Sequence, residues 1–248
     1  MVRLFSYIFL LFVLLISLGC SQKKTLQPGI CLSFDDNYIE NWIEILPLLE
    51  QYHVKATFFL TGVGNLADAE VKGLKRIQQA GHEIGAHGEQ HYSMNSFIEE
   101  NGLRTYWKNE VIANLEALHK QGIFPQVFAY PFGEKNWYID FFLFIKFKMT
   151  RNVSIAKIKN MDVQDMFYDP ANPRKNVASW GIDGSNGQEG LDLLMEKASK
   201  EGLILLLHAH QVSNEQIPYH ISSTELESIL QMAADKDLHF YSFSDLIK

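Results

Sequence analysis

The sequence predicts an α/β fold in which short parallel strands are covered by helices. Short and almost wholly apolar runs, such as residues 54–60 and 203–207, recur along the chain without the polar alternation of a strand that has one face in water. Segments with helical periodicity separate these runs, which is the order expected of strands joined by crossover helices. With 248 residues, 47% of them hydrophobic, the chain has enough apolar material for one large domain.

The first strand is expected at residues 30–36, where apolar residues at 30, 32 and 34 lead into two aspartates. Further strands are expected at 54–60, 83–86, 127–130, 149–155, 177–182, 203–207 and 240–243. Helices are expected at 41–52, 67–80, 103–121, 137–147, 191–202 and 224–235. Gly81 and Gly122 end two of these helices as C-terminal caps, and Pro47 interrupts the first.

Seven or eight strand–helix units over about 220 residues suit a barrel, in which reactive residues gather at the C-terminal ends of the strands. A doubly wound open sheet is the alternative, and periodicity does not separate the two.

The first residues form a separate segment. Arg3 precedes an apolar run at 4–18, which is typical of a secretory signal, and the ending Leu18-Gly19-Cys20-Ser21 resembles a bacterial lipoprotein signal in which Cys20 is lipidated. Ordinary secretion and an uncleaved anchor are the alternatives. We expect a signal peptide at 1–19, a polar tether at 20–27 and one domain at 28–248. The domain is then held outside the cytoplasm, on a bacterial membrane, by its N-terminal lipid alone.

Charge and cysteine content narrow the functional classes. The formal net charge is −7 and the basic residues are scattered, which argues against a nucleic-acid partner. Cys31 is the other cysteine, and it lies within the first apolar run. We expect it to be a small core residue without a disulfide.

Three apolar runs end in the same way, in an aspartate pair or a histidine. These ends are Asp35-Asp36, His87 and His208. Because the C-terminal ends of parallel strands lie on one face, the side chains are expected to form a cluster.

The spacing of His87 and His91 puts both imidazoles on one side of a helical turn, a common arrangement for binding a metal together with a carboxylate. Adjacent residues on an extended segment point in opposite directions, so one of Asp35 and Asp36 can bind metal while the other acts as a general base. With His208 as an acid, the cluster could hydrolyse an amide or ester. Taken alone, the two aspartates also fit a helix N-cap and a solvated acid.

Three stretches together resemble the polysaccharide deacetylase family: Ser33-Phe34-Asp35-Asp36-Asn37, residues 54–60, and the run Gly-His-Glu-Ile-Gly-Ala-His at 81–87. The resemblance extends over about residues 28–248. It implies a distorted (β/α) barrel of about seven strands. It also implies an enzyme that removes acetyl groups from N- or O-acetylated sugars with one divalent metal, for which we expect zinc and consider cobalt, nickel and iron. The expected partner is an acetylated glycan, and the oligomeric state stays open.

Position by position, the resemblance implies that Asp35 is the general base and that Asp36, His87 and His91 bind the metal. It implies that His208 protonates the leaving group. The turn with Tyr130, Pro131 and Phe132 is similar to a groove wall that also offers a backbone donor to the oxyanion, which we assign to the region of the Tyr130 amide.

The chain departs from the family pattern at several positions. Asn37 replaces a glycine and would preserve the loop if it adopted a left-handed conformation, Gly88 replaces a serine or threonine, and Ala129 stands where an arginine often orients the base. Arg151 or Arg174 could supply that arginine, and Asp183 is our candidate for the aspartate that tunes His208. The alternative function is a catalytically silent lipoprotein that binds glycan at the cell surface.

Overall fold

In the computed structural model, the described residues are 26–248 apart from 136, 155–164, 184–189, 216 and 248. The predicted signal at 1–19, the predicted lipidation site Cys20 and most of the tether therefore lie outside the described residues. Within the described part of the chain, no helix is long and apolar enough to span a bilayer.

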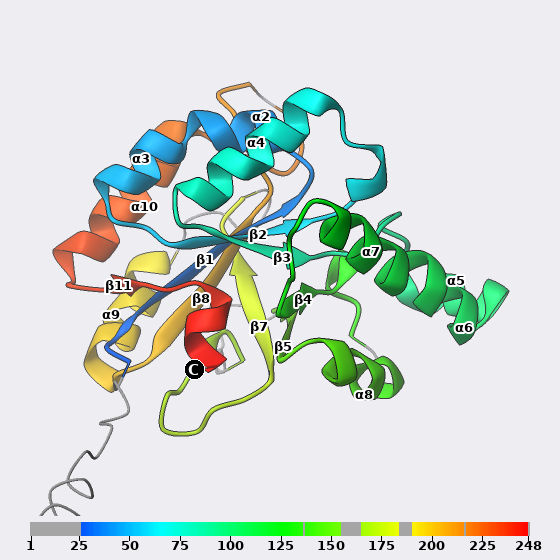
Figure 1. Cartoon of the computed structure of the whole chain (residues 1–248). Helices are drawn as coiled ribbons and strands as arrows, with labels where there is room; N and C mark the ends of the chain where they lie inside the picture. Colours follow the sequence, from blue (N-terminus) through cyan, green and yellow to red (C-terminus); the bar gives the residue numbers. More distant parts are fainter. Residues whose placement is uncertain (1–25, 136, 155–164, 184–189, 216, 248) are drawn as a thin grey trace, which may run out of the picture.

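Seven parallel strands close into a barrel (Figure 1). In their order around it, they are β1 (Gly29–Asp36), β2 (Ala56–Leu60), β3 (Glu83–Ala86), β4 (Val127–Ala129), β5 (Met149–Val153), β7 (Asn176–Gly181) and β8 (Ile204–Ala209). β8 pairs with β1 from Gly29 beside Ile204 to Phe34 beside Ala209, and this pairing closes the ring. The predicted barrel of about seven parallel strands is confirmed, and the open sheet is excluded.

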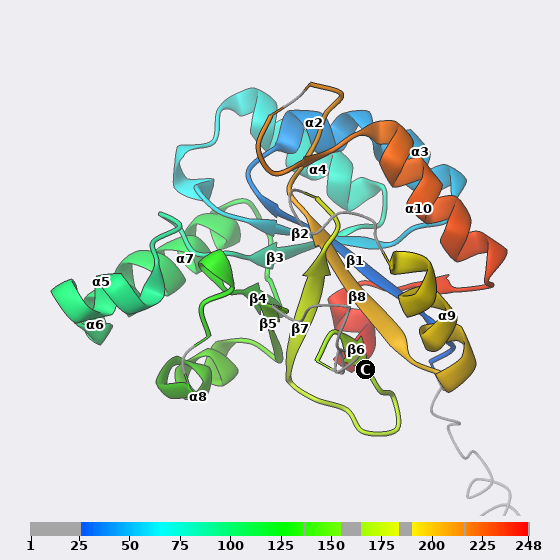
Figure 2. The same cartoon turned by 180° about the vertical axis from the view of Figure 1, so that it is seen from behind.

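Helices cover the outside of the barrel (Figures 1 and 2). They are α2 (Ile39–Glu44), α3 (Leu46–Gln51), α4 (Asp68–Gln79), α5 (Met94–Asn101), α6 (Leu103–Tyr106), α7 (Ala113–Lys120), α8 (Trp137–Lys146), α9 (Leu191–Glu201) and α10 (Ser223–Asp235).

Two predicted helices differ in detail from the structure. The single helix expected at 41–52 is wrong, because the chain forms α2 and α3 with a break at Ile45. Pro47 lies in the first turn of α3, where its missing N–H leaves no helical hydrogen bond unmade. The helix expected at 103–121 contains a π-helical segment, η2 (Trp107–Ile112), between α6 and α7.

Short elements complete the ends of the barrel. β6 (Phe167–Tyr168) pairs antiparallel with the start of β8, β11 (His239–Phe240) pairs with the start of β1, and β9 (Gln211–Val212) pairs with β10 (His220–Ile221). The strand expected at 240–243 is cut short, because the chain turns into the helical segment η5 (Phe243–Ile247). This segment lies beside β6 (Figure 2), where Tyr168 donates a hydrogen bond to the Leu246 carbonyl at 2.7 Å.

Alternation along the strands decides which residues face the interior of the barrel. Cys31 is fully buried and belongs to a cluster with Phe59, Leu206 and Phe243, so its expected role as a core residue is confirmed. Asp35 is two strand positions further along the same side of β1 as Ser33 and Cys31. Its carboxylate therefore points into the upper part of the barrel rather than into solvent.

Candidate active site

A pocket of about 350 Å³ opens where the C-terminal ends of the strands meet. Eight of the residues predicted from the sequence line it: Asp35, Asp36, His87, His91, Tyr130, Phe132, Asp183 and His208. The expectation that separate strand ends bring these side chains together is confirmed.

Asp36, His87 and His91 meet on one side of the pocket, with one ligand atom of each within 4.8 Å of the others. Asp36 Oδ1 lies 3.5 Å from His87 Nε2 and 3.3 Å from His91 Nε2. Asp36 itself has the left-handed backbone, with φ of +81°. The suggestion that Asn37 takes this conformation is wrong, and the strained residue is the one that aims its carboxylate at the histidines.

A loop, rather than a helical turn, joins the two histidines, so that expectation is also wrong. Gly88 at φ +73° and His91 at φ +55° turn the chain back and bring the second imidazole beside the first. Glu89 points away from the pocket, where its carboxylate accepts hydrogen bonds from Gly64 N at 2.7 Å and Asn114 Nδ2 at 3.1 Å.

Glu110, on η2, supports this loop from behind. Its buried carboxylate accepts a hydrogen bond from Gln90 N at 3.0 Å, and burial raises its pKa to about 7. A Cβ atom on residue 88 would clash with Glu110 Oε2. Glycine at position 88, in place of the serine or threonine of the family pattern, therefore leaves room for this carboxylate.

The donor atoms of the Asp36–His87–His91 cluster fit a divalent cation. His87 Nδ1 lies 2.9 Å from the Ala129 carbonyl, which can only accept, so Nδ1 carries the proton and Nε2 presents its lone pair. Asp36 Oδ1 is buried and has no hydrogen-bond partner among the described residues. Burial lowers the pKa of His91, which favours the neutral form that can bind a metal.

Asp35 and Arg151 form a buried ion pair across the barrel interior. Arg151 Nη2 lies 2.6 Å from Asp35 Oδ1 and 2.5 Å from Oδ2, and the two side chains are 1% and 4% exposed. Burial alone would raise the pKa of Asp35, but the Arg151 guanidinium and the neighbouring histidines together outweigh burial and hold that pKa well below its ordinary value. The carboxylate is therefore ionised and held in one orientation.

Arg151 makes the contact with Asp35 that the resemblance implies for an arginine at position 129. In the pairing of β4 with β5, Ala129 is the direct neighbour of Arg151. The guanidinium thus comes from the adjacent strand at the same height in the barrel.

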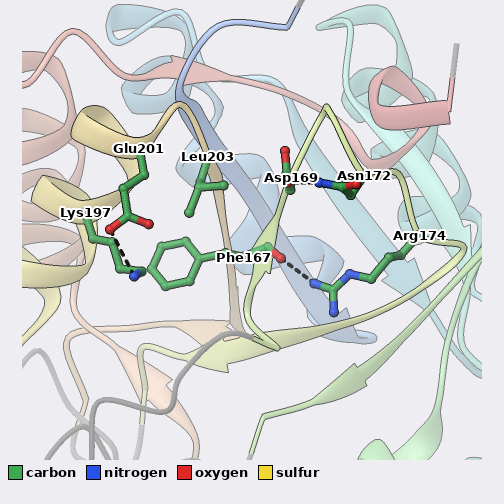
Figure 3. Close-up of a pocket in the computed structure, with 7 residues that line it drawn as sticks. All are labelled: Phe167, Asp169, Asn172, Arg174, Lys197, Glu201 and Leu203. Atoms are coloured by element: carbon green, nitrogen blue, oxygen red, sulfur yellow. Dashed lines mark hydrogen bonds and ion pairs between the residues drawn. The ribbon is translucent and has the colours of Figure 1, made fainter.

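Arg174 lies elsewhere, in a second pocket of about 390 Å³ (Figure 3). Its guanidinium donates a hydrogen bond to the Phe167 carbonyl, with Lys197 and Glu201 across the pocket. Phe167 belongs to β6, which pairs with the start of β8, so this pocket is at the end of the barrel opposite Asp35. The suggestion that Arg174 orients the base is therefore wrong.

In the turn after β4, η3 (Pro131–Gly133), one amide has no partner among the described backbone hydrogen bonds. The Tyr130 amide itself donates to the Arg151 carbonyl at 2.9 Å, so within the region assigned to the oxyanion donor this amide is already used. Pro131 has no N–H, and the Gly133 amide donates to the Tyr130 carbonyl at 2.9 Å. Among the described backbone hydrogen bonds of this turn, none uses the amide of Phe132, whose ring lies 4.5 Å from that of His91.

Asp183, the candidate for the aspartate that tunes His208, is close enough for its charge to favour a higher pKa of that histidine, but it makes no hydrogen bond to His208 among the described residues. Asp183 Oδ2 instead accepts a hydrogen bond from His210 Nδ1 at 2.9 Å, whereas His208 Nδ1 lies 2.9 Å from Ser179 Oγ. His210 lines the pocket as well; its spacing of two from His208 indicates a shared face, but a polar rim residue is the interpretation preferred from the sequence alone. Nothing in the sequence singles out Glu110.

By its fold, the chain belongs to the class of barrels found in family 4 carbohydrate esterases. The enzyme of this family from Streptomyces lividans, solved with acetate, superposes with a TM-score of 0.55 at 15% identity, over 86% of this chain and 91% of that one. A Mycobacterium smegmatis protein described as a candidate polysaccharide deacetylase superposes with a TM-score of 0.63 at 16% identity, over 91% of each chain.

The sequence agrees with this class. Residues 22–141 match the model of the polysaccharide deacetylase family. The peptidoglycan-N-acetylglucosamine deacetylase of Bacillus cereus is 35% identical over 110 residues, which are 44% of this chain and 38% of that protein. The matched region is thus less than half of the length of this curated relative. These matches support the membership of the polysaccharide deacetylase family that the motifs predicted.

Proposed function

We propose that this protein is a metal-dependent hydrolase that removes acetyl groups from a polysaccharide or other glycan. The observation that carries the proposal is the meeting, in one pocket, of an ionised and oriented carboxylate with a three-residue metal-ligand cluster. The names of two relatives support the substrate class, since one is a peptidoglycan deacetylase and another, from Pseudobutyrivibrio xylanivorans, is a bifunctional xylanase/deacetylase.

Asp36, His87 and His91 would hold one divalent cation. The bound cation would supply Lewis acidity at the acetyl carbonyl and would acidify the attacking water. Two imidazoles and one carboxylate suit zinc, which we propose as the native metal, and they also accept cobalt, nickel or iron.

The other residues would move the protons and stabilise the developing charge. Asp35 takes a proton from the water as the water oxygen attacks the acetyl carbon, and Arg151 keeps the Asp35 carboxylate aimed at that proton. The electron pair of the carbonyl moves onto its oxygen, to which the Phe132 amide can donate. The bond to the sugar nitrogen or oxygen then breaks. A histidine at the end of β8, for which the resemblance indicates His208, returns a proton to the leaving group, giving acetate and a free amine or hydroxyl.

We also propose that residues 28–248 form the catalytic domain and that a lipid on Cys20 holds it outside the cytoplasm. The lipoprotein-like sequence before Cys20 supports the anchor. An anchored enzyme with a short tether would act on a polymer of the cell envelope.

Two departures from the family pattern favour the alternative function, a silent glycan binder: the missing arginine at position 129 and the lack of a clear match for the aspartate that tunes the catalytic histidine. Because Arg151 makes the contact with Asp35 that was expected of that arginine, the first departure no longer favours the alternative.

The test combines metal analysis with acetate release from chitin oligomers, peptidoglycan, poly-N-acetylglucosamine and acetylated xylan. We expect bound metal and acetate release from at least one substrate, and Asp35→Asn should abolish turnover while the metal content stays the same. Bound metal without acetate release from any substrate would favour the glycan binder. Activity near that of wild type in the Asp35 variant would remove Asp35 from the role of base.

A further inference from the structure

Two histidines at the end of β8 face the same pocket in different surroundings. His208 and His210 are two residues apart, both line the pocket, and their ring centroids are 5.8 Å apart. Either imidazole is therefore close enough to the other for one substrate to reach both. The groups around each imidazole decide which of the two carries a second proton and is positively charged.

His208 is surrounded by groups that disfavour its charged form. It is 4% exposed and has the hydroxyl of Ser179, rather than a carboxylate, beside Nδ1. Burial and the Arg151 guanidinium lower its pKa to about 4. The neutral imidazole can accept or share a hydrogen bond at neutral pH, but it has no second proton to give.

His210 is held by a buried carboxylate. Asp183, whose side chain is 4% exposed, accepts hydrogen bonds from both His210 Nδ1 at 2.9 Å and His210 N at 2.7 Å. On the other side, Trp42 Nε1 donates to the His210 carbonyl at 2.9 Å. The backbone and one ring nitrogen are thus fixed, and the hydrogen bonds of the described residues leave Nε2 unused.

The charges around His210 favour its protonated form. Burial would lower its pKa, but the hydrogen bond with Asp183 and the charges of the neighbouring carboxylates together outweigh burial and raise the pKa to about 9. The titratable groups that face His210 are Asp183 just after β7, His208 on β8, Asp35 and Asp36 on β1, His91 on the loop after β3, and Tyr219 at the rim. The carboxylates among these groups favour the imidazolium, and Asp183 makes the direct contact.

Exposure separates the two histidines further. The side chain of His210 is 22% exposed, so it can recover a proton from solvent after each turnover, whereas His208 is almost fully buried and has little contact with solvent. Two histidines whose surroundings push them to opposite protonation states are the arrangement from which acid and base roles are assigned.

We propose that His210, positioned by Asp183, is the group that protonates the leaving nitrogen. This inference rests on the proposed deacetylase function. As the carbon–nitrogen bond breaks, its electron pair goes to the nitrogen, and the proton moves from His210 Nε2 to that nitrogen. Neutral His210 is left hydrogen-bonded to Asp183, and the products are acetate and an amine.

The test uses the dependence of the reaction on its leaving group. An amine needs a proton in order to depart, whereas the phenolate of 4-nitrophenyl acetate departs without one. We expect His210→Gln to lower kcat/KM for chitin oligomers by about 10²–10⁴-fold, the usual contribution of a general acid, and to keep the rate with 4-nitrophenyl acetate within about threefold of wild type. His119→Gln, at an exposed histidine on α7, is the matched control and should leave both rates unchanged.

Asp183→Asn tests the positioning residue. The amide keeps the size of the side chain but removes its charge, so the alkaline limb of the kcat/KM profile for chitin oligomers should move to lower pH by about 1–3 units. A merely structural role for Asp183 would lower the rate without moving this limb.

The outcomes separate the inference from the function on which it rests. If wild type releases acetate from none of the substrates, the proposed function fails and the inference fails with it. If wild type is active but the selective loss with chitin oligomers appears in His208→Gln instead of His210→Gln, the function stands and the assignment of His210 is overturned.

Discussion

Replacing Arg151 with methionine should destabilise the barrel by leaving the Asp35 carboxylate buried without a partner. Methionine retains much of the apolar bulk of the side chain but carries no charge. Arg151 is also stacked on Phe59, with its guanidinium carbon 5.1 Å from the ring centroid, and a thioether can retain part of that contact. The loss of charge is therefore the main change.

The size of the effect follows from the geometry. Arg151 Nη2 lies 2.5–2.6 Å from both carboxylate oxygens, which places the charge centres about 4 Å apart, and at an effective dielectric constant of about 20 such a pair attracts by about 4 kcal/mol. Removing one partner of a buried pair typically costs about 3–5 kcal/mol. Nε and Nη1 of Arg151 have no hydrogen-bond partner among the described residues. Asp35→Asn should therefore also lower the free energy of unfolding, because it leaves the buried guanidinium without its charged partner.

Urea unfolding of the chelator-treated protein measures this without a contribution from metal binding. We expect Arg151→Met to lower the free energy of unfolding by about 3–5 kcal/mol. In the double variant that combines Arg151→Met with Asp35→Asn, the loss in the free energy of unfolding should be smaller than the sum of the two single losses by at least about 2 kcal/mol. A loss below about 1 kcal/mol in Arg151→Met, or additive effects in the double variant, would refute the buried ion pair.

Two further predictions concern groups outside the reaction. Gly88→Ser should lower the free energy of unfolding by about 1–2 kcal/mol for the left-handed backbone, and by more because its Cβ would clash with Glu110 Oε2. Gly81→Ser is the matched control, with φ of +85° and no atom within 4 Å of the position that a Cβ would take, so equal losses in the two variants would argue against the role of Glu110. His82 is buried, accepts a hydrogen bond from Ala56 N at 3.2 Å, and has its pKa lowered by burial to about 4. As pH falls from about 6.5 towards 4, His82 therefore becomes protonated in the unfolded chain but stays neutral in the folded chain. The free energy of unfolding should fall by about 2 kcal/mol over this range. The urea midpoint of His82→Gln should decline less steeply with falling pH than that of wild type, and an equally steep decline would contradict this prediction.

The strands and the metal-ligand cluster could be predicted because their signals are local. Apolar runs that end in Asp35-Asp36, His87 and His208 identify strand ends, and parallel strands bring such ends to one face. The same locality explains the error at 41–52, where only the packed structure shows that Pro47 lies in the first turn of a second helix.

The partners of the catalytic groups could not be predicted because they depend on distances across the barrel. Asp35 and Arg151 are 116 residues apart, on strands that are not neighbours in the sheet. Asp183 could be placed near the end of β8, but the choice between His208 and His210 depends on where β7 ends relative to β8. The Tyr130 amide was a reasonable donor until the pairing of β4 with β5 extended to it.

The position of Arg151 beside Ala129 has a consequence for how the motifs of this family are read. Because residues paired across neighbouring strands lie at the same height in the barrel, a guanidinium that reaches Asp35 need not come from the strand that carries the motif. For a closed barrel, a missing motif residue should first be sought at the position registered beside it on the next strand.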